Sequence, residues 1–395
     1  MCVFTCFDLI LPQTLNNMYV YTYNMEYTRE AKGKEIVEKQ NQIRRIDEHT
    51  YSVRSQTRHV NYTVIKTNSR FICNCPDHKF RKVCCKHIHS VEISIQLREQ
   101  VRLENKVTIE PINVQICQFC NSDNLKKSGI RHNKSGNIQR FACKDCKKTF
   151  SINLGFEKMK SSPEIITQSL QLYFTGESLR NVQKFLKLQG VNVSHKTIYC
   201  WVVKYTKLMK SYLDKITPQV GDTWRADEVY VKIRGELKYV FSLMDDQTKF
   251  WIAQEVANKK HGHNARGLLK QAKQVTQTTP KVFITDGLPS YAIAYKKEFW
   301  ARERSQRTTH IRHIHITGDM NNNTMERLNG EFRDREKVTR GLKKMDSPLI
   351  DGYQLYHNYV RPHMSLENKT PAEACGIKIE GKNKWITLIQ NASNK

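Results

Sequence analysis

Three acidic residues stand where carboxylates could take part in metal-dependent chemistry. Asp227 interrupts the strand-like run TWRADEVYVKI, and Asp286 follows the apolar run VFIT directly before a glycine. Glu326 lies in MERLNGEFRDREK, whose spacing is helical, and residues 322–324 can cap that helix so that Glu326 falls in its first turn. Two divalent ions held by carboxylates can activate the attacking oxygen and stabilise the leaving one in a phosphodiester displacement. The sequence therefore predicts a catalytic site of Asp227, Asp286 and Glu326 that uses Mg²⁺ or Mn²⁺.

The helix that carries Glu326 also carries polar and basic residues on the same face. Asn329, Arg333 and Lys337 follow Glu326 at steps of three or four residues, which places them in one row. Such a row suits a place where metal and phosphate meet. We expect Asn329, Arg333 and Lys337 to contact DNA.

Other acids compete for the catalytic role. Glu228 follows Asp227 directly, so strand alternation turns its side chain to the opposite face of the sheet. Asp245 and Asp246 lie in a hairpin turn, where we expect them to be solvated, and Glu331 lies off the catalytic face of its helix.

The elements that must position the acids follow a recognisable order. Three strand-like runs joined by short turns predict an antiparallel meander, which helices and further strands then follow. The resulting order, β-β-β-α-β-α-β-α, is that of the RNase H-like fold, a mixed α/β sheet in which neighbouring strand tips would carry Asp227 and Asp286. The expected elements span residues 223–233, 237–245, 249–257, 264–277, 282–286, 290–300, 310–316 and 325–337.

Upstream, a first cluster of cysteine and histidine has the spacing of a zinc site. The pattern is C-x-C followed by C-x-H, within FICNCPDHKFRKVCCKHIHSV. Three thiolates and one imidazole satisfy tetrahedral zinc. Cys84 and His89 are spare candidates, and a chance cluster is the alternative. The predicted ligands are Cys73, Cys75, Cys85 and His87.

A second cluster consists of two C-x-x-C pairs, ICQFC and FACKDC, on either side of a longer segment. Together they predict a four-thiolate zinc ribbon, whereas a single redox pair would not explain the duplication. The intervening segment is basic and contains two glycines, which favours a hairpin that reaches phosphate through Lys126, Lys127 and Arg131. We expect Phe141 and Phe150 to pack around the metal. The predicted ligands are Cys117, Cys120, Cys143 and Cys146.

Residues 162–213 have a helical pattern with recognisable ends. Ser162 and Ser194 are expected N-caps, and Gly190 is expected to end the middle helix. Three short helices with a tight turn before the last resemble a helix-turn-helix. Its recognition helix would present His195, Lys196, Thr197 and Tyr199 to DNA, and a plain helical spacer is the alternative.

Composition supports a nucleic-acid partner. The chain has 395 residues, a formal net charge of +27 and an isoelectric point near 9.6. Such an imbalance attracts polyanions, although a merely basic or ribosome-associated protein would share it. The start of the chain lacks the cationic opening of a signal peptide, so we expect no export. Met25 opens a more ordinary charged stretch, which makes everything before Met25 a candidate for upstream over-extension.

Taken together, these residues resemble a known family. WRADEVYVKI, FITDG, NNNTMERLNGEFRDREKVTRGLKK and YHNYVRPHMSLENKTPAEACGI are similar to segments of DDE insertion-sequence transposases that carry a zinc ribbon and a helix-turn-helix. The C-x-C and C-x-H cluster resembles a SWIM zinc finger. The resemblance implies Asp227, Asp286 and Glu326 as the catalytic triad and Arg333 as the basic residue seven positions later.

The resemblance also implies a biological setting. The expected activity is nicking at element ends followed by strand transfer to target DNA, by a homodimer or larger synaptic complex in the cytoplasm, associated with the nucleoid, of a prokaryotic cell. A nuclease or resolvase of the same fold, and a non-catalytic DNA-binding regulator, remain alternatives. The expected domains are residues 1–40 (extension), 41–105 (SWIM-like finger), 106–153 (ribbon), 154–218 (helix-turn-helix), 219–345 (catalytic core) and 346–395 (C-terminal segment).

Overall fold

The computed structural model describes most of the chain. The described residues are 28–39, 41–46, 49–67, 70–104, 106–112, 116–117, 119–133, 136–151, 154–303, 306–312, 323–339, 342 and 348–394. The suggested over-extension before Met25 lies outside them. The chain divides into two units, the first chiefly residues up to Val101 and the second chiefly residues from Arg102 onward. Within the described part, no helix is both long and apolar enough to cross a membrane.

The first unit is a small antiparallel sheet with helices. Its strands are paired in sequence order, β1 (Ile43–Arg45), β2 (Thr50–Arg54), β3 (Asn61–Lys66) and β4 (Phe71–Cys73). A helix over residues 28–38, α2 (Pro76–Arg81) and α3 (Lys86–Glu104) complete it. Strand alternation turns Val53 of β2 and Val64 of β3 to one face, where they form a buried core with Ile88 and Val91 of α3.

The second unit begins with a short strand and a three-stranded sheet. The strand β5 (Val107–Ile109) pairs in parallel with β14 (Ile377–Ile379), close to the C-terminus. The sheet order is β6 (Leu125–Asn133), β7 (Gly136–Cys143) and β8 (Thr149–Ser151). The hairpin expected between the two C-x-x-C pairs is therefore present.

Three helices follow, with ends close to those predicted. They are α4 (Pro163–Thr175), α5 (Leu179–Leu188) and α6 (His195–Leu213). Ser162 caps α4 by accepting from the Ile165 amide, and Ser194 caps α6 by accepting from the Thr197 amide at 3.1 Å. Gly190, with φ of +77°, stands two residues after the end of α5.

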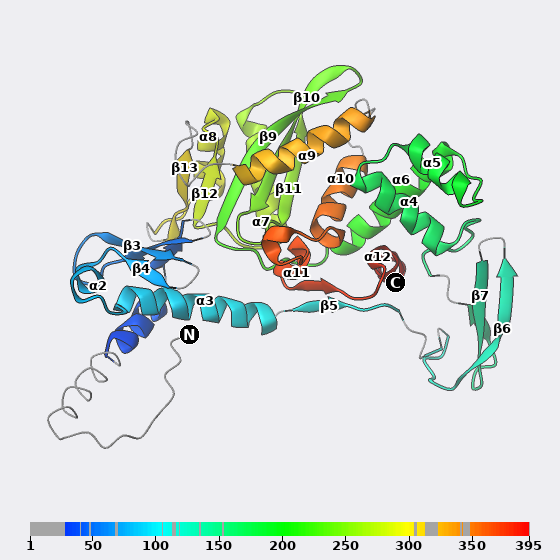
Figure 1. The fold of residues 1–395 in the computed structure, drawn as a ribbon, viewed down its shortest axis with the longest axis horizontal. Helices are drawn as coiled ribbons and strands as arrows, with labels where there is room; N and C mark the ends of the chain where they lie inside the picture. Colours follow the sequence, from blue (N-terminus) through cyan, green and yellow to red (C-terminus); the bar gives the residue numbers. More distant parts are fainter. Residues whose placement is uncertain are drawn as a thin grey trace. The chain divides into compact units, whose positions relative to one another are not determined.

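The catalytic sheet has the predicted element order. Its strands are β9 (Thr223–Ile233), β10 (Glu236–Asp245), β11 (Trp251–Ala257), β12 (Val282–Thr285) and β13 (Thr309–Arg312), and its helices are α7 (Gly262–Thr276), α8 (Pro289–Glu298) and α9 (Asn323–Thr339). The spatial order is β11-β10-β9-β12-β13, with β9 to β11 antiparallel and β12 and β13 parallel to β9. This is the mixed sheet of an RNase H-like fold, and α9 crosses in front of it (Figure 1). The last expected strand residues, 313–316, lie outside the described part.

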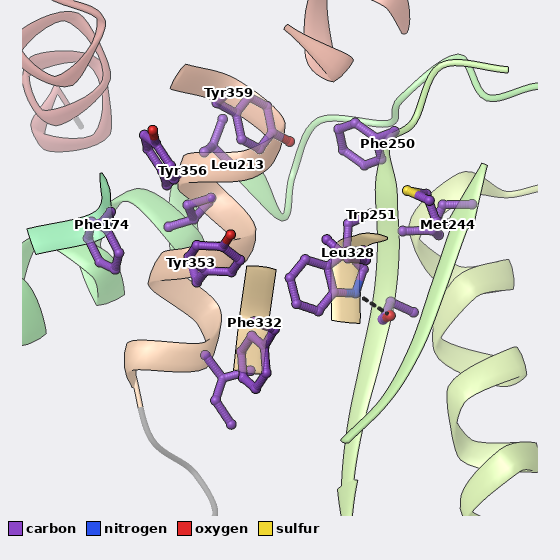
Figure 2. Close-up of a cluster of buried hydrophobic side chains, with 14 of the residues drawn as sticks. Phe174, Leu213, Met244, Phe250, Trp251, Leu328, Phe332, Tyr353, Tyr356 and Tyr359 are labelled. Carbon is purple, nitrogen blue, oxygen red and sulfur yellow. Dashed lines mark hydrogen bonds between the residues drawn. The ribbon is translucent and has the colours of Figure 1, made fainter. Parts of the chain in front are cut away.

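The C-terminal residues pack onto both the sheet and the helices α4 to α6. They form α10 (Pro348–Leu355), a π-helical turn (Tyr356–Val360), a 3₁₀ turn (Met364–Leu366), α11 (Pro371–Ala374), β14 and α12 (Lys384–Ser393). Trp251 of β11 packs edge-on against Phe332 of α9 and Tyr353 of α10, with ring centroids 6.2 and 6.3 Å apart. Figure 2 shows this cluster, in which Phe174 of α4 lies beside Tyr356. One apolar core therefore joins the catalytic sheet to the three-helix segment.

Candidate active site

Asp227 and Asp286 meet where a parallel strand pair ends. In the register of β9 and β12, Thr285 lies opposite Ala226, so Asp286 directly follows the last paired residue and Asp227 directly follows its partner. One carboxylate oxygen each of Asp227, Glu228 and Asp286 lies within 4.8 Å of the others. The topology thus brings together two of the predicted catalytic acids that are distant in sequence.

The environment of Asp227 is electrostatically costly for a lone carboxylate. Its Oδ1 accepts a 2.8 Å bond from the Glu228 amide, and its Oδ2 accepts a 2.8 Å bond from the Asn329 side chain. Burial raises the pKa of Asp227 to about 7, and the negative charges of Glu228, Asp286 and Glu326 add to this effect. Carboxylate oxygens clustered in this way fit a divalent cation, whose positive charge would relieve the repulsion between the carboxylates.

The third predicted acid, Glu326, is carried by the helix α9 and not by the sheet. It lies in the first turn of α9, as predicted, and its side chain is exposed. Asn329, one turn later, is the residue that bonds Asp227, so α9 is fixed against β9 close to Glu326. Glu326 is near enough for its charge to act on Asp227, although it lies outside the 4.8 Å group.

Glu228 and Lys260 were not expected at this site. Alternation holds, because Asp227 bonds α9 while Glu228 pairs with Lys260, just before α7. The Glu228 carboxylate nevertheless lies within 4.8 Å of both aspartates, because Asp286 at the end of β12 is reached from either face. A side chain on the opposite face of a strand can therefore join the same cluster where the neighbouring strand stops.

Three acids expected to be solvated or off the site have partners instead. Asp245 is fully buried and accepts bonds from the Thr248 amide, at 2.8 Å, and hydroxyl. Asp246, 2% exposed, pairs with Arg225 at 2.7 Å. Their turn is covered rather than open to water, so the expectation of solvation was wrong. Glu331 forms a two-pronged ion pair with Arg361 of the C-terminal segment.

The row of polar residues on α9 is only partly at the surface. Arg333 and Lys337 are exposed, and Lys337 lies 2.9 Å from Asp334. Asn329, expected to contact DNA, is 3% exposed and donates to Asp227. Its side chain therefore holds the Asp227 carboxylate, and little of it is exposed for a contact with DNA.

The four residues of the first predicted zinc site converge. Cys73 ends β4, Cys75 caps α2, and Cys85 and His87 begin α3, so each ligand is held by the end of an element. The Sγ atoms of Cys73 and Cys85 lie 4.0 and 3.8 Å from His87 Nδ1, close to the roughly 3.6 Å expected around tetrahedral zinc. All four side chains are buried. The donor set fits zinc through Nδ1 of the histidine.

The second cluster converges equally well. The Sγ atoms of Cys117 and Cys146, and those of Cys120 and Cys143, are 3.6 Å apart, near the roughly 3.8 Å between thiolates that share a zinc ion. The Phe119 amide donates to Cys117 Sγ. Phe150 and Phe141 pack against the cluster, as expected. Four thiolates in this arrangement fit zinc.

Most of the candidate DNA contacts outside the five-stranded sheet and α9 are exposed. Lys126, Lys127 and Arg131 are exposed along β6, where a bulge between Lys127 and Ile130 accompanies Gly129 at φ +78°. The remaining candidates lie at the start of α6. His195, Lys196 and Tyr199 are exposed, whereas the Thr197 hydroxyl is 2.9 Å from that of Ser194.

Residues 221–363 match the model of a family described as a DDE domain. They contain the five-stranded sheet, α9 and all three predicted catalytic acids. Residues 221–363 are a DDE domain.

Known proteins with related sequences are transposases. The chain is 25% identical over 217 residues to the transposase for insertion sequence-like element IS431mec of Staphylococcus aureus, covering 54% of this chain and 92% of that protein. The transposase for insertion sequence element IS257 in transposon Tn4003 of Staphylococcus aureus gives the same values. Among solved structures, the HTLV-2 integrase catalytic core domain in complex with magnesium is 14% identical, with a TM-score of 0.30, over 40% of this chain and 98% of that one.

The DDE domain contains contacts around the candidate acids that sequence patterns did not reveal. Asn329 has the right spacing for a surface contact, and only the packing of α9 on β9 turns it to Asp227. Glu228 and Lys260 lie in different elements of the chain, and neither belongs to a motif. The position of Lys260, a few residues before the expected helix 264–277, was the one feature of the sequence that could have suggested a partner for Glu228.

Proposed function

We propose that this chain is the transposase of an insertion sequence, with Asp227, Asp286 and Glu326 as its catalytic acids. The observation that carries the proposal is the meeting of Asp227 and Asp286 at the end of the parallel β9 and β12 pair, with α9 bonded to Asp227 one turn after Glu326. This is an arrangement of carboxylates suited to divalent ions, inside a DDE domain.

The chain's own residues hold and orient the reacting groups. Asp227, Asp286 and Glu326 would hold Mg²⁺, which when bound supplies activation of the attacking oxygen and stabilisation of the leaving one. Asn329 fixes the Asp227 carboxylate through Oδ2, which leaves fewer orientations to be ordered when DNA binds. Arg333 and Lys337, exposed on α9, would bind the backbone phosphates that flank the cleaved bond.

The upstream modules would recognise the element ends. Zinc at the two four-residue clusters would fix the first unit and the ribbon, whose exposed Lys126, Lys127 and Arg131 bind phosphate. The helices α4 to α6 would act as a helix-turn-helix, with the start of α6 in the major groove. The N-terminal cluster would be a SWIM finger. A dimer or larger assembly follows from the need to hold two ends at once.

The test is an assay that separates binding, cleavage and joining. The full chain is incubated with Mg²⁺, a DNA carrying the inverted repeats that flank its gene, and a target plasmid. We expect nicking at the repeats and joining of the freed 3′ hydroxyl to the plasmid. Cleavage without joining would establish the nuclease alternative, and binding without cleavage the regulator alternative.

A further inference from the structure

The catalytic cluster contains a carboxylate that the three-acid arrangement does not use. Glu228 has one oxygen within 4.8 Å of oxygens of both Asp227 and Asp286. Its side chain is only 2% exposed, and its Oε1 pairs with Lys260. The other oxygen, Oε2, is buried and has no hydrogen-bond partner among the described residues. A buried carboxylate oxygen without a hydrogen bond of ordinary geometry is costly, and a bound cation would relieve that cost.

The surroundings of Glu228 act on its charge in both directions. Tyr291 in α8 is fully buried, and its hydroxyl is near enough to act on the Glu228 carboxylate, although no hydrogen bond of ordinary geometry joins the two groups. Burial raises the pKa of Glu228, while Lys260 acts in the opposite direction by stabilising the ionised form. The neighbouring groups thus include one cation, Lys260, together with the acids Asp227 and Asp286.

Lys260 is held independently of Glu228. Its Nζ lies 5.1 Å from the ring centroid of Tyr230 and 5.2 Å from that of Tyr239, within the range of cation–π attraction. The two rings lie against each other, with centroids 4.8 Å apart. The ammonium therefore keeps a place beside the site even when the carboxylate is removed.

We propose that Glu228 is an additional carboxylate ligand of the divalent ions in this site, and that Lys260 offsets its charge. The inference rests on the proposed function, since it concerns the same ions. With Lys260 paired to Oε1, Oε2 is the atom offered to a cation, and the pair adds a ligand without adding net charge. This ligand is distinct from Asp227, Asp286 and Glu326 and follows from where β12 stops.

The proposal makes opposite predictions for the two partners. Glu228→Gln removes a ligand and a negative charge while Lys260 remains, so Mn²⁺ affinity should fall at least fivefold. Lys260→Met removes the offsetting positive charge, so Mn²⁺ affinity should rise two- to fivefold. If the pair acted on the ions only through its charges, the two variants would change Mn²⁺ affinity by similar factors in opposite directions, so a fall in Glu228→Gln no larger than the rise in Lys260→Met counts against a ligand. Asp334→Asn, whose side chain is 75% exposed on α9, is the matched charge control and should bind as the unaltered protein does.

The measurement is a titration of the zinc-loaded, DNA-free full chain with Mn²⁺, in which free Mn²⁺ is followed by electron paramagnetic resonance. A second measurement is the rise in Tm on adding Mn²⁺, which should be smaller in Glu228→Gln. Asp227→Asn serves as the reference for the site itself.

If Asp227→Asn weakens Mn²⁺ binding and Glu228→Gln does not, Glu228 is no ligand and the proposed function stands. If neither weakens binding, the catalytic metal site itself is wrong. Should Glu228→Gln not fold, Glu228→Asp decides, because it keeps the charge and shortens the side chain: weaker Mn²⁺ binding is expected, and unchanged binding overturns the proposal.

Discussion

The side-chain amide of Asn329 donates a 2.8 Å hydrogen bond to Oδ2 of Asp227, across 102 positions of sequence. The bond ties the catalytic end of α9 to β9, and Asn329 lies one helical turn after Glu326. Because Asn329 is buried and Asp227 is partly buried, the bond restricts the carboxylate and the helix together. Because Asn329 bonds Asp227 and lies one turn after Glu326, its position helps to set the distance between the candidate catalytic acids Asp227 and Glu326.

Replacing Asn329 should impair catalysis more than folding. In Asn329→Ala, Asp227 loses a donor, and we expect strand transfer to fall roughly 10- to 100-fold, as is typical for residues that orient metal ligands. The free energy of unfolding should fall by about 1 to 2 kcal/mol. Single-turnover joining assays and chemical denaturation measure the two effects. Equal activity of Asn329→Ala and Asp334→Asn would contradict the role given to Asn329.

The three catalytic acids should be required for chemistry and dispensable for binding. Asp227→Asn, Asp286→Asn and Glu326→Gln keep shape but remove charge, so cleavage and joining should fall by at least 10³-fold. Binding to element-end DNA should survive, because the candidate DNA contacts on β6 and α6 lie outside the DDE domain. Gel-shift and cleavage assays on the same preparations check both outcomes.

A change of ligand softness sharpens that test. Asp227→Cys should be inactive with Mg²⁺ and partly active with Mn²⁺, which tolerates sulfur better. Asp245→Asn is unsuitable as a control, because Asp245 is buried and accepts two hydrogen bonds from Thr248. Asp334→Asn, exposed on the same helix as Glu326, is the suitable one. Activity of Asp227→Cys with Mg²⁺ equal to that of the unaltered chain would remove Asp227 from the metal site.

The sequence predicted the elements of the site better than its contacts. Strand alternation and helix caps are local, so β9, β12 and the start of α9 were within reach of pattern analysis. The burial of Asp245 and Asp246 was not, because it depends on Arg225, Thr248 and the packing of residues far along the chain. The Glu228 position was missed for a different reason. Alternation holds in β9, but it does not show that β9 continues beyond the end of β12, where Asp286 lies close to both Asp227 and Glu228.

The two cysteine clusters should each bind one zinc ion. The purified, reduced chain should contain about two zincs, and Cys117→Ser or Cys75→Ser should each lower the content by about one. Cys200→Ser, an exposed cysteine on α6, is the matched control and should retain both. Elemental analysis of folded protein is the measurement. Full zinc content in Cys117→Ser would contradict the ribbon site.

The ribbon and α6 should contribute to DNA binding in different ways. Lys126→Ala and Lys127→Ala should weaken binding to all DNA and flatten its salt dependence, each by about one counterion, since both lysines are exposed on β6. Lys196→Ala should instead reduce the preference for element ends over random DNA. Thr197 is a poorer probe, because its hydroxyl lies 2.9 Å from that of the N-cap Ser194. Fluorescence anisotropy at several salt concentrations separates the two behaviours, and a uniform loss in all three variants would exclude α6 as the reading element.

His357 should make the stability of the second unit depend on acid pH. Its ring is buried, Nε2 lies 3.0 Å from the Lys249 carbonyl, and burial lowers its pKa to about 3. The unfolded chain, with a histidine pKa near 6.5, binds the proton more readily between about pH 6.5 and 3. The contribution of this residue is therefore complete above pH 6.5 and is lost as the pH falls, by up to about 1.4 kcal/mol per pH unit.

The His357→Gln variant isolates this contribution. Glutamine can still donate to the Lys249 carbonyl but does not titrate, so the stability difference between the unaltered chain and the variant should shrink from pH 7 to pH 4.5. Carboxylates with raised pKa values, such as Asp227, act in the opposite sense, but they are common to both proteins and cancel in the difference.

All five tryptophans, the earliest of which is Trp201, lie in the second unit, so their fluorescence during urea unfolding follows that unit alone. A stability difference that stays constant between pH 7 and pH 4.5 would mean that His357 is as readily protonated in the folded chain as in the unfolded one.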